Sequence, residues 1–380
     1  MKVARRAIIP PFIVMDMMRA AAEREAAGGD VLHLEVGQPS TPAPDRVLET
    51  AQRLLGESRL GYTVALGIPE LRQAISDHYQ RAYGVNVPSE RIVATTGSSG
   101  AFLLSFLSAF EAGDRVALAA PGYPCYRHIL STLGVEPVSL ETGPQDRFQP
   151  TVAHLKALDK PVDGLILASP SNPTGTMLSR TEMSALVAYC RTEGIRVISD
   201  EIYHGITYGS PASTVAELEP SAVVINSFSK YFSMTGWRLG WMVVPEDLLR
   251  PIECLAQNLF ISPPTLSQYA ALSVFDCIPE LDSHVARYAR NRELLLNELP
   301  KAGFKDLAPA DGAFYIYADV SHRTADSEAF CKQMLAQTGV AATPGVDFDA
   351  ARGHHFVRFS FAGATHDMAE AAKRLKAWRG

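Results

Sequence analysis

The chain has 380 residues, 47% hydrophobic and 20% charged, with a formal net charge of −6. This length exceeds what one compact core usually holds, so we expect two domains, and the composition is that of an ordinary globular protein. The negative charge gives no electrostatic reason to expect nucleic acid or an anionic membrane as a partner, and no apolar run approaches the ~20 residues of a membrane span.

Cysteine usage favours a reducing compartment. The five cysteines are odd in number, widely scattered and lack a C-x-x-C pair. Such a distribution predicts free thiols and argues against a disulfide framework or a zinc site. We therefore expect a cytoplasmic protein with no metal centre. The five residues are Cys125, Cys190, Cys254, Cys277 and Cys331.

The N-terminal segment imitates a signal peptide only loosely. Residues 1–6 are basic and residues 8–14 are apolar, but Pro10 and Pro11 interrupt the apolar stretch and charged residues follow at 19–25. We expect a structured arm that leads into an amphipathic helix.

The middle of the chain alternates between apolar β-branched runs and helical patterns such as 101–110 and 180–193, which predicts a mostly parallel α/β sheet. Asn172, Asp200 and Lys230 each follow an expected strand, and reactive groups in such sheets gather at the carboxyl ends of the strands. We therefore expect these three side chains to converge. The expected strands are residues 91–95, 115–119, 163–169, 195–199, 222–227 and 238–244.

The last hundred residues predict a second unit of mixed helices and strands. Residues 281–300 form a long, arginine-rich helical pattern, followed by an expected strand at 313–319, a helix at 327–337, a strand at 356–361 and a helix at 367–378. This is an α+β arrangement.

Lys230 has the most specific surroundings of any residue in the chain. It lies in the run SFSKYFSMTGWRLG at residues 227–240, directly after the apolar stretch 222–226. A lysine just past a buried strand loses hydration, which favours the neutral amine that attacks an aldehyde. Nearby serines and Arg238 can hold a phosphate. Pyridoxal 5'-phosphate (PLP) carries both an aldehyde and a phosphate, so we favour this cofactor over the alternative of a solvated loop lysine.

Asp200 follows the apolar run 195–199 and is expected to be buried. A buried carboxylate needs a cationic or hydrogen-bonding partner. The protonated pyridine nitrogen of PLP is such a cation, and at ~4 Å with an effective dielectric near 20 the pair attracts by about 4 kcal/mol. The alternative is a helix N-cap aspartate. With Lys230 later in the chain, we favour the ring partner.

The segment Gly-Ser-Ser-Gly-Ala at residues 97–101 begins a helix directly after an expected strand. Free backbone N–H groups at a helix N-terminus bind phosphate. An ordinary N-cap is the more frequent explanation of such a pattern, and both interpretations stay open.

Arg358 lies between Phe356, Val357 and Phe359 in an apolar, strand-like run. A guanidinium there is costly unless it is paired, and its planar fork suits a carboxylate. The alternative is a structural salt bridge to an internal acid.

Several blocks of the sequence resemble the class I and II aminotransferases, the fold type I PLP enzymes related to aspartate aminotransferase. They include the lysine run, Asn-Pro-Thr-Gly at 172–175, Asp-Glu-Ile-Tyr at 200–203, and segments at 61–72 and 356–360. The blocks follow the family's order from about residue 30 to residue 360. The resemblance implies a large PLP-binding domain at 46–285 and a small α+β domain at 286–380, with residues 1–45 forming an N-terminal arm and part of the small domain.

The resemblance also implies roles for individual residues. Lys230 would form the Schiff base with PLP and would act with Asp200 and Tyr203 in catalysis, and Tyr62 would reach the phosphate of a neighbouring subunit in a homodimer with shared sites. The remaining implied contacts are Ser98, Ser99, Gly100, Ser227, Ser229 and Arg238 to phosphate, Tyr123 to the ring face, Asn172 and Tyr203 to the phenolic oxygen, and Gly37, Asn172 and Arg358 to the substrate carboxylate.

The implied activity is transfer of an amino group from an L-amino acid to a 2-oxo acid such as 2-oxoglutarate or pyruvate. One alternative is a carbon–sulfur lyase or another β/γ-eliminating enzyme of the same fold, because the same carbanion precedes both reactions. A non-enzymatic regulator would carry a basic DNA-binding domain ahead of the fold, and the first matching block begins near residue 31, so we do not expect one.

The substrate side chain is expected to be neutral, apolar or aromatic. Some dicarboxylate-specific relatives supply a lysine where Ser99 stands, and others supply an arginine of the neighbouring subunit after the lysine block. Residues 251–286 of this chain contain neither Lys nor Arg. An apolar side chain would rest against Phe12, Ile13 or Phe260. Aspartate aminotransferase stays an alternative if a cation for the distal carboxylate lies elsewhere.

Overall fold

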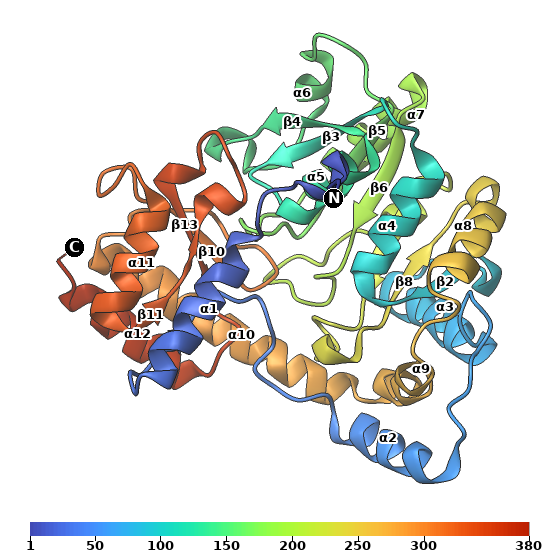
Figure 1. Ribbon diagram of the computed structural model, residues 1–380, viewed down its shortest axis with the longest axis horizontal. Coiled ribbons are helices and arrows are strands. Elements are labelled where there is room, and N and C mark those ends of the chain that lie inside the picture. Colours follow the sequence, from blue (N-terminus) through green and yellow to red (C-terminus); the bar gives the residue numbers. More distant parts are fainter. Residues whose placement is uncertain (380) are drawn as a thin grey trace.

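A seven-stranded sheet lies at the centre of the larger part of the molecule (Figure 1). The computed structural model describes residues 1–379. Neighbouring strands are parallel except β8, which runs antiparallel to both β2 and β7, so the predicted mostly parallel α/β sheet is confirmed. In the order β2-β8-β7-β6-β5-β3-β4, the strands are Ile92–Thr95, Gly240–Val243, Val223–Ser227, Arg196–Asp200, Gly164–Ala168, Arg115–Ala120 and Glu136–Glu141.

Helices cover both faces of this sheet because successive side chains of a strand point to opposite sides. On β6, Val197 belongs to one apolar cluster and Ile198 to the other. Helices α4, α5 and α8 pack on the Ile198 side, whereas α2, α3, α6, α7 and α9 pack with the Val197 cluster. The helices are α2 Asp45–Glu57, α3 Pro69–Tyr83, α4 Gly97–Ala109, α5 Pro124–Leu133, α6 Val152–Lys156, α7 Arg180–Glu193, α8 Glu246–Leu259 and α9 Thr265–Ala271.

A four-stranded antiparallel sheet forms the second unit, with the order β12-β13-β10-β9. Helix α10, 21 residues long, leads into this unit from the larger part (Figure 1). The predicted α+β character of this region is confirmed. The elements are α10 Ile278–Glu298, β9 Asp306–Leu307, β10 Tyr315–Asp319, α11 Ser327–Thr338, β12 Thr343–Pro344, β13 Phe356–Ser360 and α12 Thr365–Ala377.

The first part of the chain packs against the last part. Strand β1 (Leu32–His33) pairs in parallel with β11 (Val340–Ala341), and α1 (Ile13–Ala26) contacts β11 and β12. In Figure 1 the blue helix α1 lies across the orange and red C-terminal elements. The backbone N–H groups of Ile13 and Val14, at the start of α1, donate to the carboxylate of Asp347 at 3.0 and 3.1 Å.

Strand β4 was not expected from the sequence. Its residues, Glu-Pro-Val-Ser-Leu-Glu, include a proline and three polar side chains, and only one of the six is buried. Both features are compatible with a strand only at the edge of a sheet, which is where β4 lies.

Within residues 1–379 every helix is too short or too polar to cross a lipid bilayer. The five cysteines are free thiols.

Candidate active site

A cavity lies where β5, β6 and β7 end, and it is closed on other sides by α1 and the four-stranded sheet. The predicted convergence of Asn172, Asp200 and Lys230 is observed, since all three line this cavity. The other predicted site residues in its lining are Gly37, Ser98, Ser99, Tyr123, Tyr203, Ser229, Arg238 and Arg358.

Lys230 enters the cavity three residues after the end of β7. Its Nζ donates to the backbone carbonyl of Gly37 at 2.7 Å and lies 5.8 Å from the centre of the Tyr203 ring. The pKa of Lys230 is lowered to about 8, mainly by burial and also by the charge of Arg358, while the charge of Asp200 opposes both effects. A pKa near 8 makes the neutral, nucleophilic amine available close to neutral pH.

Asp200 is the last residue of β6 and is only 4% exposed. Its carboxylate accepts hydrogen bonds from the Tyr126 hydroxyl and from the Ile202 N–H at 3.1 Å, and it forms no ion pair within the described part of the chain. Burial raises the pKa of Asp200 to about 6, although the Tyr126 hydrogen bond opposes the shift. A buried carboxylate of this kind is stabilised by a nearby cation, as the protonated ring nitrogen of PLP would be.

The N-terminus of α4 and the Arg238 side chain form one end of the cavity. A Cβ added to Gly97, whose φ is +68°, would lie 2.5 Å from Nη2 of Arg238. Ser98, Ser99 and Ser229 line the same end. Backbone N–H groups, hydroxyls and a guanidinium gathered in this way fit a phosphate.

Two predicted phosphate contacts lie behind this surface. Ser227 is buried, donates to Ser229 Oγ at 3.0 Å and accepts from the Ser229 N–H at 3.1 Å, so it orients Ser229. Gly100 is also buried and does not line the cavity.

Arg358 projects from β13 into the cavity and is 2% exposed. Its Nη1 donates to Oδ1 of Asn172 at 2.8 Å, and its Nη2 donates to the Glu35 carbonyl and to Thr343 Oγ1. Its Nε is buried without a hydrogen-bond partner among the described residues. None of these partners is an acid, so the alternative of an internal salt bridge is not observed, and the guanidinium fits a substrate carboxylate.

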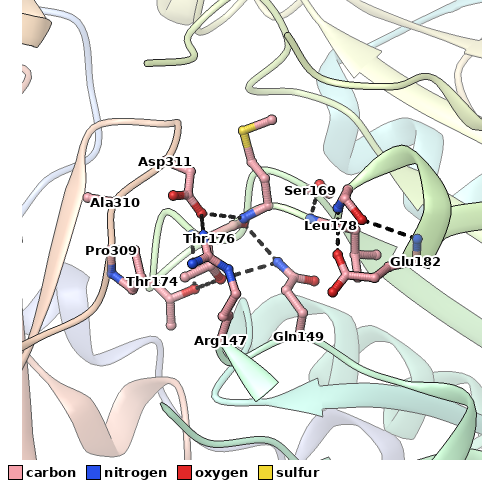
Figure 2. A network of polar contacts seen from close by, with 12 residues as sticks. Arg147, Gln149, Ser169, Thr174, Thr176, Leu178, Glu182, Pro309, Ala310 and Asp311 are labelled. Atoms are coloured by element: carbon pink, nitrogen blue, oxygen red, sulfur yellow. Dashed lines mark hydrogen bonds and ion pairs between the residues drawn. The ribbon is translucent and has the colours of Figure 1, made fainter. Parts of the chain in front are cut away.

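The loop that carries Asn172 is held in place by polar contacts on both sides (Figure 2). Gln149 Nε2 donates to the Thr176 carbonyl at 2.8 Å from the side of the large sheet. On the other side, Asp311 accepts from the Met177 N–H at 3.1 Å and pairs with Arg147. Asn172 is thereby fixed next to Arg358.

Besides Ser227 and Gly100, three further predicted residues lie outside the cavity in the single chain. Tyr62 is 84% exposed on the surface, and neither Ile13 nor Phe260 lines the cavity. Phe12 does line it, and its ring packs edge-to-face on Tyr123 with centroids 5.8 Å apart.

Residues of α1 and the segment before it form an apolar wall of the cavity. We use this name for Phe12, Val14, Met15 and Met18, all of which line the cavity. Arg238, Arg358 and Lys230 are the cations in the lining among residues 1–379.

Sequence reasoning missed several residues of this site, including the apolar side chains Val14, Met15 and Met18. Tyr126, Gly240 and Tyr315 were missed as well. Tyr126 lies three positions after Tyr123 on α5, a spacing that places both near one face of a helix and that could have suggested a shared role. Gly240 passes so close to α4 that an added Cβ would lie 2.9 Å from the Ser98 nitrogen. Tyr315 donates to or accepts from Tyr203 between hydroxyls 2.7 Å apart, and no local pattern indicates this contact.

The arrangement fits PLP on four grounds: an amine with a lowered pKa, a buried carboxylate that forms no ion pair in the described chain, a helix N-terminus beside an arginine, and an aromatic ring at Tyr123. Across the described residues, no group of three or more His, Cys, Asp or Glu is placed to hold a metal ion.

Comparisons with known proteins agree with this geometry. The sequence profile of the family described as aminotransferase class I and II matches residues 29–375. Valine–pyruvate aminotransferase of Mycobacterium tuberculosis is 54% identical, over 99% of this chain and 98% of that protein. A crystal structure of an aminotransferase from M. tuberculosis superposes with a TM-score of 0.98 at 53% identity, covering 100% of this chain and 99% of that one.

More distant structures share the fold. Aspartate aminotransferase from Thermus thermophilus with maleate has a TM-score of 0.92 at 29% identity and covers 99% of both chains. The resemblance inferred from the sequence is therefore confirmed. The chain belongs to the class I and II aminotransferase family and is a PLP-dependent aminotransferase.

Proposed function

We propose that the enzyme transfers the amino group of an L-amino acid with an uncharged, apolar side chain to a 2-oxo acid, with pyruvate as the preferred acceptor and 2-oxoglutarate as a second. The observation that carries the proposal is the apolar wall of Phe12, Val14, Met15 and Met18, which faces the cavity where no further cation lies in the described lining.

The electrostatics of the cavity support an uncharged side chain. In this assignment Lys230 serves the cofactor, Arg238 its phosphate and Arg358 the substrate α-carboxylate. A distal carboxylate would then be buried against apolar groups without a partner, at a cost of several kcal/mol. The name of the M. tuberculosis relative, a valine–pyruvate aminotransferase, favours an aliphatic donor and pyruvate.

In the proposed mechanism, PLP supplies an electron-withdrawing ring that stabilises negative charge at the substrate Cα. Asp200 would hold the ring nitrogen protonated, and Asn172 and Tyr203 would hydrogen-bond the phenolic oxygen. Arg358 orients the substrate through its carboxylate. The Lys230 amine, with its pKa near 8, takes the proton from Cα as general base and returns one as general acid on the way to the product.

We further propose a homodimer in which Tyr62 of one subunit completes the phosphate site of the other. Tyr62 lies with other exposed apolar side chains, including Val64 at 59% and Ile261 at 51% exposure, and such surfaces mark subunit interfaces. The proposed domain division is 46–285 for the large domain and 286–380 for the small one, with 1–45 shared between the arm and the small domain.

A donor panel tests the substrate assignment. Valine, leucine, alanine, phenylalanine and aspartate are each assayed with pyruvate and with 2-oxoglutarate, and ammonia release is measured in parallel. We expect kcat/KM for valine to exceed that for aspartate by a hundredfold or more, because several kcal/mol separate the two. A tenfold preference for aspartate, about 1.4 kcal/mol, would contradict the proposal. Ammonia formed without an acceptor would instead indicate an eliminating enzyme.

A further inference from the structure

Tyr315, the first residue of β10, contacts three parts of the site at once. Its ring is 1% exposed, and its hydroxyl lies 2.7 Å from that of Tyr203. The guanidinium carbon of Arg358 lies 4.4 Å from the centre of its ring. Its hydroxyl also touches the backbone at Gly37, where an added Cβ would lie 1.7 Å away.

The contact with Gly37 reaches Lys230. The Gly37 carbonyl accepts the hydrogen bond from Lys230 Nζ at 2.7 Å. Only a glycine leaves room for the Tyr315 hydroxyl at this place, because any side chain at residue 37 would overlap it. Tyr315 therefore helps to define where the carbonyl that holds the Lys230 amine lies.

The pairing of the two hydroxyls has a direction once the cofactor is considered. A tyrosine hydroxyl has one hydrogen to donate and two lone pairs to accept. If Tyr203 donates its hydrogen to the phenolic oxygen of PLP, its own oxygen must accept from Tyr315. The Tyr315 hydroxyl has no other hydrogen-bond partner among residues 1–379, so it is free to donate.

We infer that Tyr315 is a positioning residue that donates its hydroxyl hydrogen to Tyr203, and thereby strengthens the hydrogen bond from Tyr203 to the phenolic oxygen of the cofactor, while its ring supports Arg358. The inference rests on the proposed role of Tyr203. Consecutive hydrogen bonds polarise one another, so removal of the first donor weakens the second bond.

The two contributions of Tyr315 are separable by substitution. Tyr315→Phe removes the hydroxyl and keeps the ring on Arg358, whereas Tyr315→Leu removes both. Tyr317→Phe is a matched control, because Tyr317 lies on the same strand, is equally buried, has no hydrogen-bond partner for its hydroxyl in the described chain and does not line the cavity.

The first measurement is a pH titration of the visible absorption band of the holoenzyme. Donation to the phenolic oxygen stabilises its negative charge, so the proton shared by that oxygen and the Lys230 nitrogen leaves at a lower pH. We expect Tyr315→Phe to raise the midpoint by a few tenths of a unit, roughly the 10–30% by which one hydrogen bond strengthens the next in a chain. Tyr203→Phe raises it at least as much, and Tyr317→Phe leaves it unchanged.

The double variant Tyr203→Phe/Tyr315→Phe gives the sharpest result. Without a hydroxyl at residue 203, the Tyr315 hydroxyl has nothing through which to act. We expect the midpoint of the double variant to equal that of Tyr203→Phe alone, a complete loss of additivity. Additive shifts would overturn the inference, because they would mean that Tyr315 acts independently of Tyr203.

Steady-state kinetics test the part played by the ring. Tyr315→Phe is expected to leave KM for the amino donor within about twofold, whereas Tyr315→Leu raises it roughly fivefold, since Arg358 loses its aromatic support. Equal KM values for the two variants would mean that the ring of Tyr315 does not support Arg358.

Gly37→Ala displaces the Tyr315 hydroxyl without removing it, so this variant should also raise the midpoint. It takes the place of Tyr315→Phe in the test if that variant is recovered in too small an amount. If the midpoint is unmoved in Tyr315→Phe and raised in Tyr203→Phe, the inference about Tyr315 is overturned and the proposed role of Tyr203 stands. Unmoved midpoints in both variants overturn the proposed role of Tyr203 and the inference with it.

Discussion

Burial acts in opposite directions on the two central ionisable residues of the site. It lowers the pKa of the Lys230 amine to about 8 and raises that of the Asp200 carboxyl to about 6, and in each case it favours the neutral form. Without a ligand, both groups are therefore neutral more readily than they would be in water.

The wild-type holoenzyme should have a visible absorbance band that borohydride reduction abolishes, and replacement of Lys230 by alanine should remove this band. Turnover of Lys230→Ala should fall by about 10²–10⁴-fold or more, since the general base is lost. Peptide mapping of the reduced wild type should place the cofactor label on Lys230. Lys301→Ala, at an exposed position, is the control. Full turnover in Lys230→Ala would contradict the mechanism.

Asp200 should make the cofactor-free protein less stable as the pH rises. Between its ordinary pKa of 3.8 and about 6, the folded protein keeps a proton that the unfolded chain releases, so the free energy of unfolding falls across this window. Asp200→Asn lacks this titration. Between pH 3.5 and 7, its free energy of unfolding should therefore fall by roughly 3 kcal/mol less than that of the wild type. Urea unfolding at both pH values measures the difference.

Asp306→Asn, at an exposed position of β9, provides the comparison for this experiment. Identical pH dependence in the wild type and Asp200→Asn would mean that folding leaves the pKa of this carboxyl at its value in the unfolded chain.

Residues with an unusual chemical type for their surroundings were found from the sequence, because a lysine, aspartate or arginine beside an apolar strand is conspicuous. Tyr126, Gly240 and Tyr315 were not found. Their importance lies in contacts with residues 74, 142 and 112 positions away, such as Asp200, Ser98 and Tyr203, which only the folded chain brings together.

At the scale of elements, the buried strands were predictable and the exposed one was not. The six expected strands of the large sheet lie within two residues of β2, β3, β5, β6, β7 and β8 at each end, since burial on both faces requires continuous apolar runs. β4 and the two-residue strands β1 and β11 have no such pattern. They form because a neighbouring strand offers free backbone groups.

Helix α1 carries the apolar wall, and its position depends on a distant carboxylate. Asp347 accepts hydrogen bonds from the first two N–H groups of α1 and is 1% exposed. Asp347→Ala removes this cap, which typically costs about 1 kcal/mol. We expect kcat/KM for valine to fall roughly fivefold, and that for alanine to fall less because a methyl group has less apolar surface to pack against the wall.

Asp347→Asn retains an acceptor oxygen, so its kcat/KM for valine should lie between those of the wild type and Asp347→Ala. Equal losses for valine and alanine would show that α1 acts on the whole site and not on the substrate side chain.

At the scale of the whole molecule, the proposal of a homodimer makes a prediction about mixed subunits. Lys230→Ala and Tyr62→Phe chains are each impaired, but a heterodimer of the two contains one site with both residues intact. Heterodimers that are formed by mixing the two chains and are then purified should therefore regain activity, up to about half that of a wild-type dimer. Activity no higher than that of the two parent dimers would contradict shared sites, and a mixture of wild type and Lys230→Ala calibrates the exchange.

The pairing of β1 with β11 joins residues about 300 positions apart, and Asp347 meets Ile13 across 334. During synthesis the N-terminal arm therefore cannot pair with β11 or Asp347 until nearly the whole chain has left the ribosome. The wall of the cavity, the carbonyl that holds Lys230 and the carbonyl that holds Arg358 all belong to this arm. A prematurely terminated chain whose large sheet folds would still lack a docked arm, so we expect incomplete copies to be inert rather than poorly selective.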